Sequence, residues 1–526
     1  MRNKEERFFY RQNKKGWRFA RNLIYNRVIF ISLLILVQVA LVVGFAFWGL
    51  QYIEVYFGSS ILLRIIFFIY LVNCPGKNEF KLAWLLPVFI APVIGITLYI
   101  FYHANTSGRS FGKKLTNVKL ITNTYLTENS ETKELSANFP ERADLIRYMN
   151  FLEAYPPYSK TRVDYYPNGE SFEESLLKEL KNAKHFIFIE FFIISADESW
   201  LKIVEILKEK VKQGVEVRVL YDAIGSVFSA TKTHQKYLEK AGIKAKIFLP
   251  LAPVFATQQN NRDHRKIVVI DGKTAYTGGI NISSEYFNRE HKRFKYWKDT
   301  AVKIKGPAIK TFTTMFLQNW NLISKETDEY EKYINLPYSC YEKYNGLVIP
   351  YGDDAYNNED YAENTYLYMI SHAKKYVHIT TPYVIIDNMM MNALIFAAKR
   401  GVEVSIIVPS KPDHFVTFCI GRTFLKTLIE AGIHIYNYDE GFIHAKNVIC
   451  DGTSATVGSV NLDYRSFYHH FECGLYMYKC DVINKIEKDF QDTLCQCSEM
   501  TVHSYKKLSL PVRFIGRVMR VFAPLM

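Results

Sequence analysis

The hydrophobic residues of this chain are distributed in one way over its first hundred positions and in another way over the rest. Near the N-terminus they form three apolar runs, at residues 28–50, 55–72 and 82–102, and the first run carries no charged residue. A helix needs about 20 apolar residues to cross a bilayer, and buried helices of soluble domains rarely reach that length without a charge. The runs therefore predict transmembrane helices within an N-terminal membrane region, residues 1–103.

Charged residues and prolines in and around these runs bear on the membrane topology. Arg64 interrupts the second run, and Pro87 and Pro92 lie inside the third. Residues 1–27 carry nine lysine or arginine residues and two acids, and such a basic excess favours a cytoplasmic N-terminus. Three complete spans would place the rest of the chain outside the cytoplasm, whereas one re-entrant run would keep it inside. The sequence leaves both arrangements open.

After residue 145 the pattern changes to short apolar stretches that alternate with amphipathic ones, and it occurs twice. The segment SWLKIVEILKEKVKQG has apolar residues at steps of three and four and ends in glycine, as an amphipathic helix does. The apolar stretches HFIFIEFFII and KYVHITTPYVII stand at matching places in the two halves. Continuous apolarity of this kind is typical of strands covered on both faces. Each half is therefore expected to run strand, helix, strand, helix, strand.

This repetition predicts an α/β fold made of two similar lobes that follow the membrane region. Gly214 and Gly401, for example, end the first predicted helix in each half and precede the same Val-Glu-Val sequence. Residues 104–335 are predicted as the first lobe and residues 336–526 as the second, with the join near 325–355.

The charge balance narrows the class of partner. The chain has 66 lysine and arginine residues against 52 acids, a formal net charge of +14. A basic protein of this kind favours an anionic partner, either nucleic acid or anionic lipid, and the apolar runs favour lipid. Eight cysteines in 526 residues do not make a disulfide framework.

Two copies of one histidine-lysine-aspartate pattern stand 180 residues apart. A single H-x-K-x4-D pattern often arises by chance, whereas two copies that also agree further downstream are a strong signal. The copies, within residues 258–285 and 438–465, consist of His264, Lys266, Asp271, Gly278 and Asn281, and of His444, Lys446, Asp451, Gly458 and Asn461.

These residue types suit chemistry on a phosphodiester. Side chains two residues apart share one face of a strand, so each copy presents an imidazole beside an ammonium group. If the copies converge by pseudo-twofold symmetry, one histidine can attack phosphorus to form a phosphohistidine, and the other can protonate the leaving oxygen. The lysines and asparagines would stabilise the charge on the remaining oxygens. No metal is expected, because these fixed groups replace it.

The two aspartates belong to the same candidate catalytic motif but are expected to act differently. Asp271 and Asp451 are each followed by glycine between two apolar stretches, which is a hairpin signal, so they are predicted to be turn residues that support the site. The strands then return as KTAYTGG and TSATVGS. Gly278, and Gly458 with Ser459, are expected there to let the backbone approach a bound anion.

Two acidic residues downstream are candidates for holding the histidines in place. A working histidine often has its far nitrogen bound by a carboxylate. Asp299, in YWKDT, and Glu472 offer one such acid to each half, with ordinary solvated acids as the alternative. The adjacent pair His469 and His470 has no support from the repeat and is interpreted as structural.

With both motifs intact, as HRKIVVIDGKTAYTGGINIS and HAKNVICDGTSATVGSVNLD, the chain resembles the phospholipase D superfamily, whose mark is a pair of HxKxxxxD motifs. Within that superfamily it is most similar to bacterial cardiolipin synthases. The supporting segments are KLAWLLPVFIAPVIGITLYIFY, YWKDT and the C-terminal VFAPLM. The resemblance covers residues 55–526, and the apolar run before it is an extra span compared with the two-span form of the family.

The resemblance implies two phospholipase D-like α/β lobes with the active site at their interface, preceded by transmembrane helices. It implies a phosphatidyltransferase that joins two phosphatidylglycerols into cardiolipin and glycerol, with His264 as nucleophile and His444 as acid. Membrane phospholipids are then the partners, no cofactor or nucleic acid is expected, and the protein is expected in the bacterial cell membrane as a multi-pass protein. A membrane-anchored phospholipase D that hydrolyses phospholipids is the main alternative, and a nuclease of the same fold is a weaker one.

The last residues, 505–526, mix basic and apolar positions. After Pro511, Arg513, Arg517 and Arg520 recur at steps of four and three and predict one basic helical face opposite an apolar one. Such a helix fits the surface of an anionic membrane, and a helix that caps the globular region is the alternative.

Overall fold

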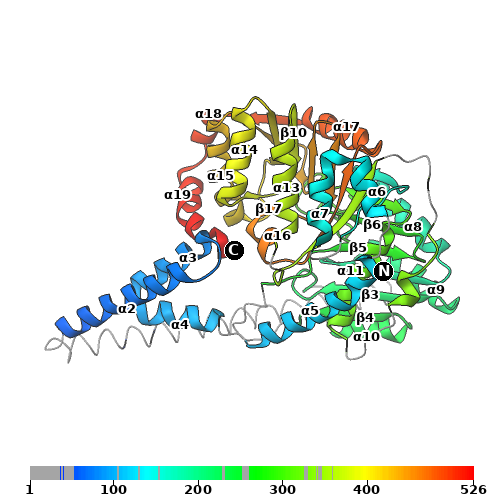
Figure 1. Cartoon of the computed structure of the whole chain (residues 1–526), viewed down its shortest axis with the longest axis horizontal. Coiled ribbons are helices and arrows are strands. Elements are labelled where there is room, and N and C mark those ends of the chain that lie inside the picture. The colour runs from blue at the N-terminus through cyan, green and yellow to red at the C-terminus, as the bar shows by residue number, and fades with distance from the viewer. Residues whose placement is uncertain are drawn as a thin grey trace.

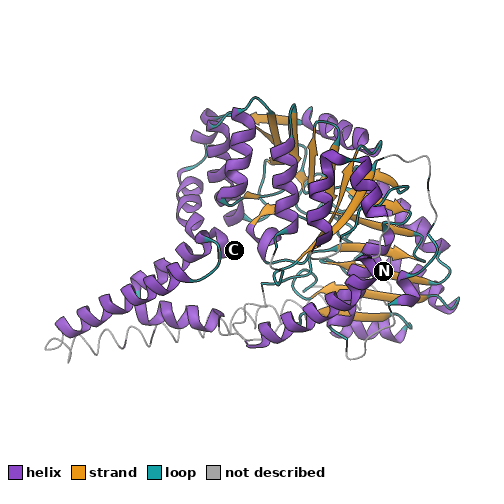
Figure 2. Cartoon of the chain, in the orientation of Figure 1, coloured by secondary structure: helices purple, strands orange, loops and turns teal. Residues whose placement is uncertain are grey.

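The computed structural model describes residues 53–103, 106–127, 131–151, 155–227, 232–250, 260–324, 330–338, 341, 346–357 and 359–525, together with Leu36 and Ala40. The body consists of two β-sheets with helices on their outer sides, and the helices nearest the N-terminus project from one side of it (Figure 1, Figure 2). The predicted α/β duplication is therefore confirmed.

The first sheet has seven strands in the order β1-β8-β6-β5-β2-β3-β4. Strands β2, β3 and β4 are parallel to one another, and the pairs from β2 to β5 and onward to β1 are antiparallel. The strands are β1 (Arg162–Tyr166), β2 (Phe186–Phe191), β3 (Glu216–Asp222), β4 (Lys244–Phe248), β5 (Lys266–Ile270), β6 (Thr274–Gly278) and β8 (Ala301–Lys305).

The second sheet repeats this order and adds one strand at its edge. Its order is β19-β13-β12-β10-β15-β16-β18-β9, so that β9 corresponds to β1 and β13 to β4. The strands are β9 (Leu347–Asp353), β10 (Tyr376–Thr380), β12 (Glu403–Pro409), β13 (His434–Tyr438), β15 (Asn447–Cys450), β16 (Ser454–Gly458), β18 (Glu472–Tyr478) and β19 (Cys497–Met500).

Two short parallel pairs lie outside these sheets. The pair β11 (Val384–Ile385) and β17 (Leu462–Asp463) lies within the second lobe. The pair β7 (Trp297–Lys298) and β14 (Phe442–Ile443) joins the two lobes. Isolated bridges also connect the lobes, among them Tyr158 with Val348 and Asp263 with Phe471.

Amphipathic helices cover the outer face of each sheet. The helices over the first sheet are α8 (Gly169–Asn182), α9 (Glu198–Lys212) and α10 (Lys232–Lys240), and those over the second are α13 (Tyr361–His372), α14 (Asn388–Lys399) and α15 (Phe415–Glu430). Gly214 and Gly401 follow α9 and α14 with φ angles of 84° and 90°. Glycine reaches this left-handed region without steric cost, so the predicted helix ends are confirmed at both places.

The remaining helices connect the lobes and the two ends of the chain. They are α5 (Thr106–Thr127), α6 (Glu131–Asn138), η2 (Pro140–Arg142), α7 (Ala143–Phe151), α11 (Ile309–Leu322), α12 (Glu331–Ile334), α16 (Tyr464–Tyr468), α17 (Val482–Leu494), α18 (Val502–Lys506), α19 (Leu510–Met519) and η4 (Arg520–Leu525).

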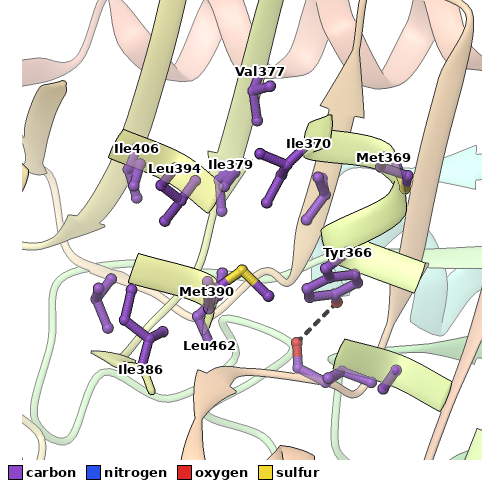
Figure 3. Packing of buried hydrophobic residues seen from close by; sticks show 14 of the residues in the cluster. Tyr366, Met369, Ile370, Val377, Ile379, Ile386, Met390, Leu394, Ile406 and Leu462 are labelled. Carbon is purple, nitrogen blue, oxygen red and sulfur yellow. Dashed lines mark hydrogen bonds between the residues drawn. The ribbon is translucent and has the colours of Figure 1, made fainter. Parts of the chain in front are cut away.

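One hydrophobic core lies between the two sheets, and each lobe has another under its outer helices. The shared core contains Ile267 and Val269 of β5, Ile449 of β15 and Leu475 of β18, together with α11, which is buried along its whole length. The outer core of the second lobe packs β10 and β12 against α13 and α14, and Tyr366 donates to the main-chain oxygen of Val460 at 3.2 Å (Figure 3). Because the two sheets share this core, the loops at the ends of their strands are held in fixed positions relative to one another.

The predicted third membrane span is two helices instead of one. Helix α3 (Asn78–Ile90) ends before Ala91, and α4 (Pro92–His103) begins at Pro92. Ala91 has φ −142° and ψ 84°, because proline disfavours a helical conformation in the residue before it. Helices α3 and α4 pack against each other and against α2 (Ile53–Asn73), which contains the predicted second run. A single helix over residues 82–102 is therefore wrong.

Within the described part of the chain, we find no helix with both the length and the apolar character needed to cross a bilayer. The predicted first span, residues 28–50, lies outside the described residues apart from Leu36 and Ala40.

Candidate active site

His264 lies just before β5, at the point where the first lobe meets the second. Asp263 forms a bridge with Phe471, and the main-chain N–H of His264 donates to the Phe471 oxygen at 2.9 Å. This pairing brings Glu472, the first residue of β18, beside the imidazole. Nδ1 of His264 lies 2.8 Å from Oε1 and 3.0 Å from Oε2 of Glu472. The acid that holds His264 therefore comes from the second lobe.

His444 is positioned in the same way, by a short strand pair across the lobe interface, but here the histidine belongs to the second lobe and the acid to the first. Strand β14 pairs with β7, and the N–H of His444 donates to the Lys298 oxygen at 2.7 Å. Nδ1 of His444 then lies 2.6 Å from Oδ2 of Asp299, which belongs to the first lobe. The prediction that Asp299 and Glu472 bind the histidines is confirmed. Each acid, however, serves the histidine of the opposite lobe, because the short strand pairs that place them cross the interface.

The pair of His264 and Glu472 holds a neutral imidazole beside an ionised carboxylate. Burial lowers the pKa of His264 to about 3, although Glu472 opposes that shift. Burial alone would raise the pKa of Glu472, but the adjacent His264 stabilises the carboxylate and holds its pKa well below the usual range. The Ser459 hydroxyl also donates to Oε2 of Glu472. An ionised carboxylate only accepts hydrogen bonds, so the ring proton of His264 lies on Nδ1, and Nε2 keeps a free lone pair.

The pair of His444 and Asp299 has a different electrostatic environment. Burial raises the pKa of Asp299 to about 7, while Lys446 and the N–H of Thr300, 2.8 Å from Oδ1, oppose the shift. Burial and the charge of Lys446 lower the pKa of His444 well below its usual value. Nζ of Lys446 lies 2.8 Å from Nδ1 of His444. Nδ1 of His444 is thus approached by an ammonium group and by a carboxyl group that is half protonated near neutral pH.

Both motif lysines are buried beside their histidines. Lys266 donates to the main-chain oxygen of His264 at 2.6 Å, and Lys446 donates to that of His444. Burial lowers the pKa of Lys266 to about 7 and that of Lys446 to about 8. The mutual repulsion of the two ammonium groups contributes to the shift of Lys266. Two cations held so close together favour an anion between them.

The two motif aspartates are scaffold residues, as the Asp-Gly pattern predicts. Asp271 accepts hydrogen bonds from the N–H groups of Lys184, His185 and Phe186 at 2.7–2.9 Å. Asp451 accepts the same three bonds in the second lobe, from Lys374, Lys375 and Tyr376. Both aspartates have φ angles near 55°, at 54° and 56°, in hairpin turns that join β5 to β6 and β15 to β16.

The glycines that follow have a different role from the predicted one. A side chain on Gly278 would overlap the Thr300 oxygen, and one on Gly458 would overlap the Cys473 oxygen. These glycines therefore allow the neighbouring strands β8 and β18 to approach, and the space beside them is filled by protein backbone instead of an anion. Gly279 and Ser459 are the next residues, and a side chain on Gly279 would overlap the carboxylate of Asp299.

The two motif asparagines each keep one unpaired amide atom in the site. Oδ1 of Asn281 accepts from the N–H of Ile193 at 3.1 Å, and its Nδ2 has no partner among the described residues. The main-chain N–H of Asn461 donates to the Ser466 hydroxyl, and Oδ1 of Asn461 has no hydrogen-bond partner among the described residues. Both side chains are buried, so a substrate can supply the missing bonds.

One residue of the site was not identified from the sequence. His470 is buried with its ring centroid 5.3 Å from that of His264. His470 stands two residues before Glu472, and Trp297 stands two residues before Asp299. The ring of Trp297 lies 5.5 Å from that of His444. If the two acids are aligned with each other, His470 and Trp297 occupy equivalent positions, and this alignment could have identified His470 as a site residue.

His264, His470 and Glu472 are also the one set of potential metal ligands among the described residues, with ligand atoms within 4.8 Å of one another. Nδ1 of His264, however, is already bonded to Glu472, and the charge of Lys266 acts on both of them. A dication here would displace that bond and lie close to a buried ammonium group. The set suits an anionic ligand better than a metal ion.

Comparison with known families agrees with this geometry. The family model described as "Cardiolipin synthase, PLD-like domain" matches residues 176–320 and 366–494. The two matched segments contain both histidine motifs and the acids that bind them.

Relatives that match over most of their length include two cardiolipin synthases. Cardiolipin synthase 2 of Bacillus anthracis is 34% identical over 454 residues, which is 86% of this chain and 87% of that protein. Cardiolipin synthase of Geobacillus thermodenitrificans is 30% identical over 498 residues, 94% of this chain and 98% of that protein. An uncharacterized protein of Streptococcus mutans is 41% identical over 462 residues, 87% of this chain and 99% of that protein.

Among solved structures, a phosphatidylserine synthase of Haemophilus influenzae has the same fold. The TM-score is 0.54 at 18% sequence identity, and the match covers 75% of this chain and 98% of that one.

Proposed function

This chain belongs to the cardiolipin synthase family of phospholipase D-like proteins, and we propose that it joins two phosphatidylglycerol molecules into cardiolipin and glycerol in two steps at the lobe interface. The observation that carries the assignment of roles is the difference between the two histidine pairs. Nδ1 of His264 faces an ionised Glu472, whereas Nδ1 of His444 faces the ammonium group of Lys446.

In the first step, Nε2 of His264 attacks the phosphorus of one phosphatidylglycerol. The bond from phosphorus to the headgroup glycerol oxygen breaks, and that oxygen takes a proton from Nε2 of His444. A protonated lysine can only donate, so Nδ1 of His444 accepts and the ring proton lies on Nε2, where the leaving oxygen needs it. As that proton leaves, the Asp299 carboxyl, whose Oδ2 lies 2.6 Å from Nδ1, gives its proton to Nδ1, so the ring stays neutral. Glycerol leaves, and the phosphatidyl group stays on His264 as a phosphohistidine.

In the second step, the terminal glycerol hydroxyl of another phosphatidylglycerol attacks the same phosphorus. Nε2 of His444 now takes the hydroxyl proton, and the bond from phosphorus to Nε2 of His264 breaks. His264 regains its lone pair, His444 regains the proton on Nε2, and Nδ1 returns its proton to Asp299. The site is then back in its starting state and releases cardiolipin. The same group acts as acid and then as base, which is general acid–base catalysis.

The buried cations and amides stabilise charge on the phosphoryl oxygens in both steps. Lys266 and Lys446 supply the positive charge, and the unpaired Nδ2 of Asn281 supplies a donor. Preorganised donors of this kind act on the transition state without first having to reorient. We assign this role to protein groups and not to a bound metal.

We also propose that residues 1–103 hold the lobes, residues 104–335 and 336–526, at the bacterial cell membrane, in a multi-pass arrangement that includes residues 28–50. Helices α2 and α3 support this location, because they expose apolar side chains such as Ile66 and Phe89. A site at the membrane meets lipid alcohol at a high local concentration. This favours transfer to phosphatidylglycerol over transfer to water.

The experiment that tests the function uses the purified full chain in detergent, with phosphatidylglycerol as the only lipid and EDTA present. Mass spectrometry should find cardiolipin and glycerol in equal amounts. Phosphatidic acid in place of cardiolipin would identify the protein as a hydrolase. Loss of activity in EDTA that one specific divalent ion restores would contradict charge stabilisation by the lysines.

The two-histidine mechanism predicts that neither histidine can replace the other. His264→Ala or His444→Ala should lower turnover by at least about 10³-fold, as expected for loss of a nucleophile or its acid–base partner. His444→Ala should still accumulate labelled phosphatidyl group on His264 when a substrate with a good leaving group is supplied, whereas His264→Ala should not become labelled. Label on His444 of the His264→Ala protein would reverse the assigned roles.

A further inference from the structure

The two motif histidines each have a partner at Nδ1, but a third imidazole in the site has none. His470 is 7% exposed, and neither its Nδ1 nor its Nε2 has a hydrogen-bond partner within the described residues. Oε1 of Glu472 lies 3.6 Å from Nδ1, beyond normal hydrogen-bond range. Burying a polar group without a partner costs free energy, so an unpaired imidazole in an active site points to a ligand that completes it.

The main chain fixes His470 relative to His264. The N–H of His470 donates to the Arg465 oxygen at 2.8 Å, and the next residue, Phe471, bonds to the chain on both sides of Asp263. The His470 ring therefore lies beside the His264 ring, with centroids 5.3 Å apart and a tilt of 42°. The ring of Phe192 lies 6.4 Å from that of His470 and 4.9 Å from that of His264. An oxygen on a phosphorus atom carried by His264 can reach a ring nitrogen of His470 from this position.

The pseudo-twofold axis shows that a second imidazole is present on only one side of the site. The place of His470 is taken in the first lobe by Trp297, whose ring lies 5.5 Å from that of His444 and whose indole Nε1 can donate but not accept. Tyr286 and Phe442 stand beside the same histidine at 5.4 and 6.1 Å. The surroundings of His444 are therefore mainly aromatic, whereas His264 has a second imidazole beside it.

We propose that His470 is a third active-site histidine that hydrogen-bonds a phosphoryl oxygen of the phosphatidyl group while His264 carries it. The proposal rests on the function proposed above and adds a residue that neither motif contains. Its consequence is an asymmetric site. The half around His264 retains the phosphatidyl group, and the half around His444 receives and releases glycerol alcohols.

A purely positioning role, in which His470 only supports Glu472, is the competing explanation. The two roles predict different effects on the affinity of the site for inorganic phosphate. If His470 contacts phosphoryl oxygens, it contributes to the binding of inorganic phosphate, a competitive probe of the same place. If it acts only through Glu472, its loss changes turnover but leaves phosphate affinity unchanged.

The experiment compares His470→Phe, His470→Gln and His469→Phe in the full chain. Phenylalanine keeps the ring and removes both nitrogens, and glutamine restores a donor. His469 is the matched control, because it is the adjacent histidine and lies against Phe80 and the Pro524 oxygen instead of the site. Release of headgroup glycerol from phosphatidylglycerol gives kcat and KM, and inorganic phosphate is added as inhibitor.

His470→Phe is expected to lower kcat/KM by about 10- to 100-fold, as for one lost hydrogen bond to a charged group. It should raise the phosphate inhibition constant by about the same factor. His470→Gln should regain most of both losses, and His469→Phe should stay within about twofold of wild type. Should His470→Phe fail to fold, His470→Met keeps the bulk without the hydrogen bond and answers the same question.

Two results would overturn the proposal. The first is a His470→Phe enzyme within twofold of wild type in kcat/KM and phosphate inhibition. The second is a fall in turnover with phosphate inhibition unchanged, which would leave His470 as a support for Glu472. Glycerol release is common to transfer and hydrolysis, so these results are readable even if the wild-type product proves to be phosphatidic acid, which would refute only the proposed function.

Discussion

The two histidines occupy equivalent positions but are held by carboxylic acids of different length. In the first lobe Gly279 leaves room for the short side chain of Asp299 to lie against the backbone, whereas Ser459 in the second lobe donates its hydroxyl to Glu472. His264 holds the pKa of Glu472 well below its usual range, whereas burial raises the pKa of Asp299 to about 7. The two carboxyl groups therefore differ both in how they are held and in their protonation state.

This difference predicts unequal effects for two matched substitutions. Gly279→Ala should displace Asp299, because the added carbon overlaps its carboxylate, and kcat should fall by at least about 10²-fold, as for a misplaced acid–base pair. Ser459→Ala removes one hydrogen bond from Glu472 and should cost only about tenfold. Steady-state kinetics of both variants checks the order. Equal losses would show that the two carboxylates are held equally tightly.

The buried lysines predict an alkaline limit to activity. Lys266 and Lys446 have pKa values lowered to about 7 and about 8 by burial. Each is charged below its pKa and neutral above it, so kcat/KM should fall as pH rises through about 7 and about 8 and the free enzyme loses its anion-binding charge. A bound phosphodiester stabilises the charged lysines and so raises their pKa values. The fall of kcat, measured at saturating substrate, should therefore occur at a higher pH than the fall of kcat/KM. Profiles of kcat/KM that stay flat to about pH 10 would exclude this role for the lysines.

At the scale of single residues the sequence predicted the side chains of the candidate site well and their pairing poorly. The repeat identified both His-Lys pairs and the turn roles of the aspartates, and the segments downstream offered one acid to each half. That each acid binds the histidine of the opposite lobe depends on how the two sheets pack, and no local pattern encodes that packing. His470 was missed because its counterpart, Trp297, is a different type of residue.

At the scale of elements, the crossed short strands make each half of the site depend on both lobes. Strand β7 pairs with β14, and Asp263 pairs with Phe471, so His444 and His264 receive their acids across the interface. Neither lobe alone contains a complete pair of histidine and acid. The interface is therefore part of the candidate active site.

The helix order was predictable because glycines and amphipathic spacing are local signals. Helices α9 and α14 end where Gly214 and Gly401 stand, and β5 and β6 turn at an Asp-Gly pair. Pro92 in the sequence indicates the break between α3 and α4, but the length of the apolar run alone predicts one continuous helix. Apolar length predicts a span only where the backbone can stay helical throughout.

One partly buried ion cluster attaches the N-terminal helices to the second lobe. Lys77, at the start of α3, lies 2.8 Å from Glu363, 3.6 Å from Asp387 and 3.1 Å from Asp360, and it donates to the Tyr468 hydroxyl at 2.6 Å. Burial raises the pKa of Glu363 to about 7 even with Lys77 present. The lysine is therefore the group that allows these acids to lie so close together.

Replacing Lys77 should destabilise the second lobe. Lys77→Met should lower the free energy of unfolding by about 1–3 kcal/mol, because it leaves buried carboxylates without a counter-charge. Without the lysine the acids take up protons more readily when folded than when unfolded, so the loss should be larger at about pH 8 than at about pH 5. Lys81→Met, which removes only a contact to the Val72 oxygen, is the control. Thermal unfolding at both pH values measures the difference, and equal stability of the two variants would refute this role for Lys77.

At the scale of the whole molecule, α19 lies near the N-terminal helices on one side of the body (Figure 1). It packs on α15 through Gly516, where any side chain would overlap the Cys419 oxygen, and Arg520 lies over the Phe424 ring at 4.1 Å. The predicted basic face is therefore divided, because Arg520 packs against the lobe. Helix α19 therefore packs on the second lobe along one side, yet it still exposes Leu510, Phe514 and Val518.

These exposed residues predict that α19 also touches the bilayer. A helix fixed to the body needs no apolar residues on its outer face for packing, yet Phe514 is 69% exposed there, and burying such a side chain in lipid is favourable by about 1.5–3 kcal/mol. Phe514→Trp should therefore add tryptophan emission that bromine-labelled phospholipids quench, with the full chain in phosphatidylglycerol vesicles. Phe151→Trp is the matched control, because Phe151 is 78% exposed at the end of α7, away from α19. Quenching of the emission added at position 514, and none at position 151, places the outer face of α19 in the membrane. Equal quenching at both positions, or at neither, would leave α19 as a helix that serves only to cap the second lobe.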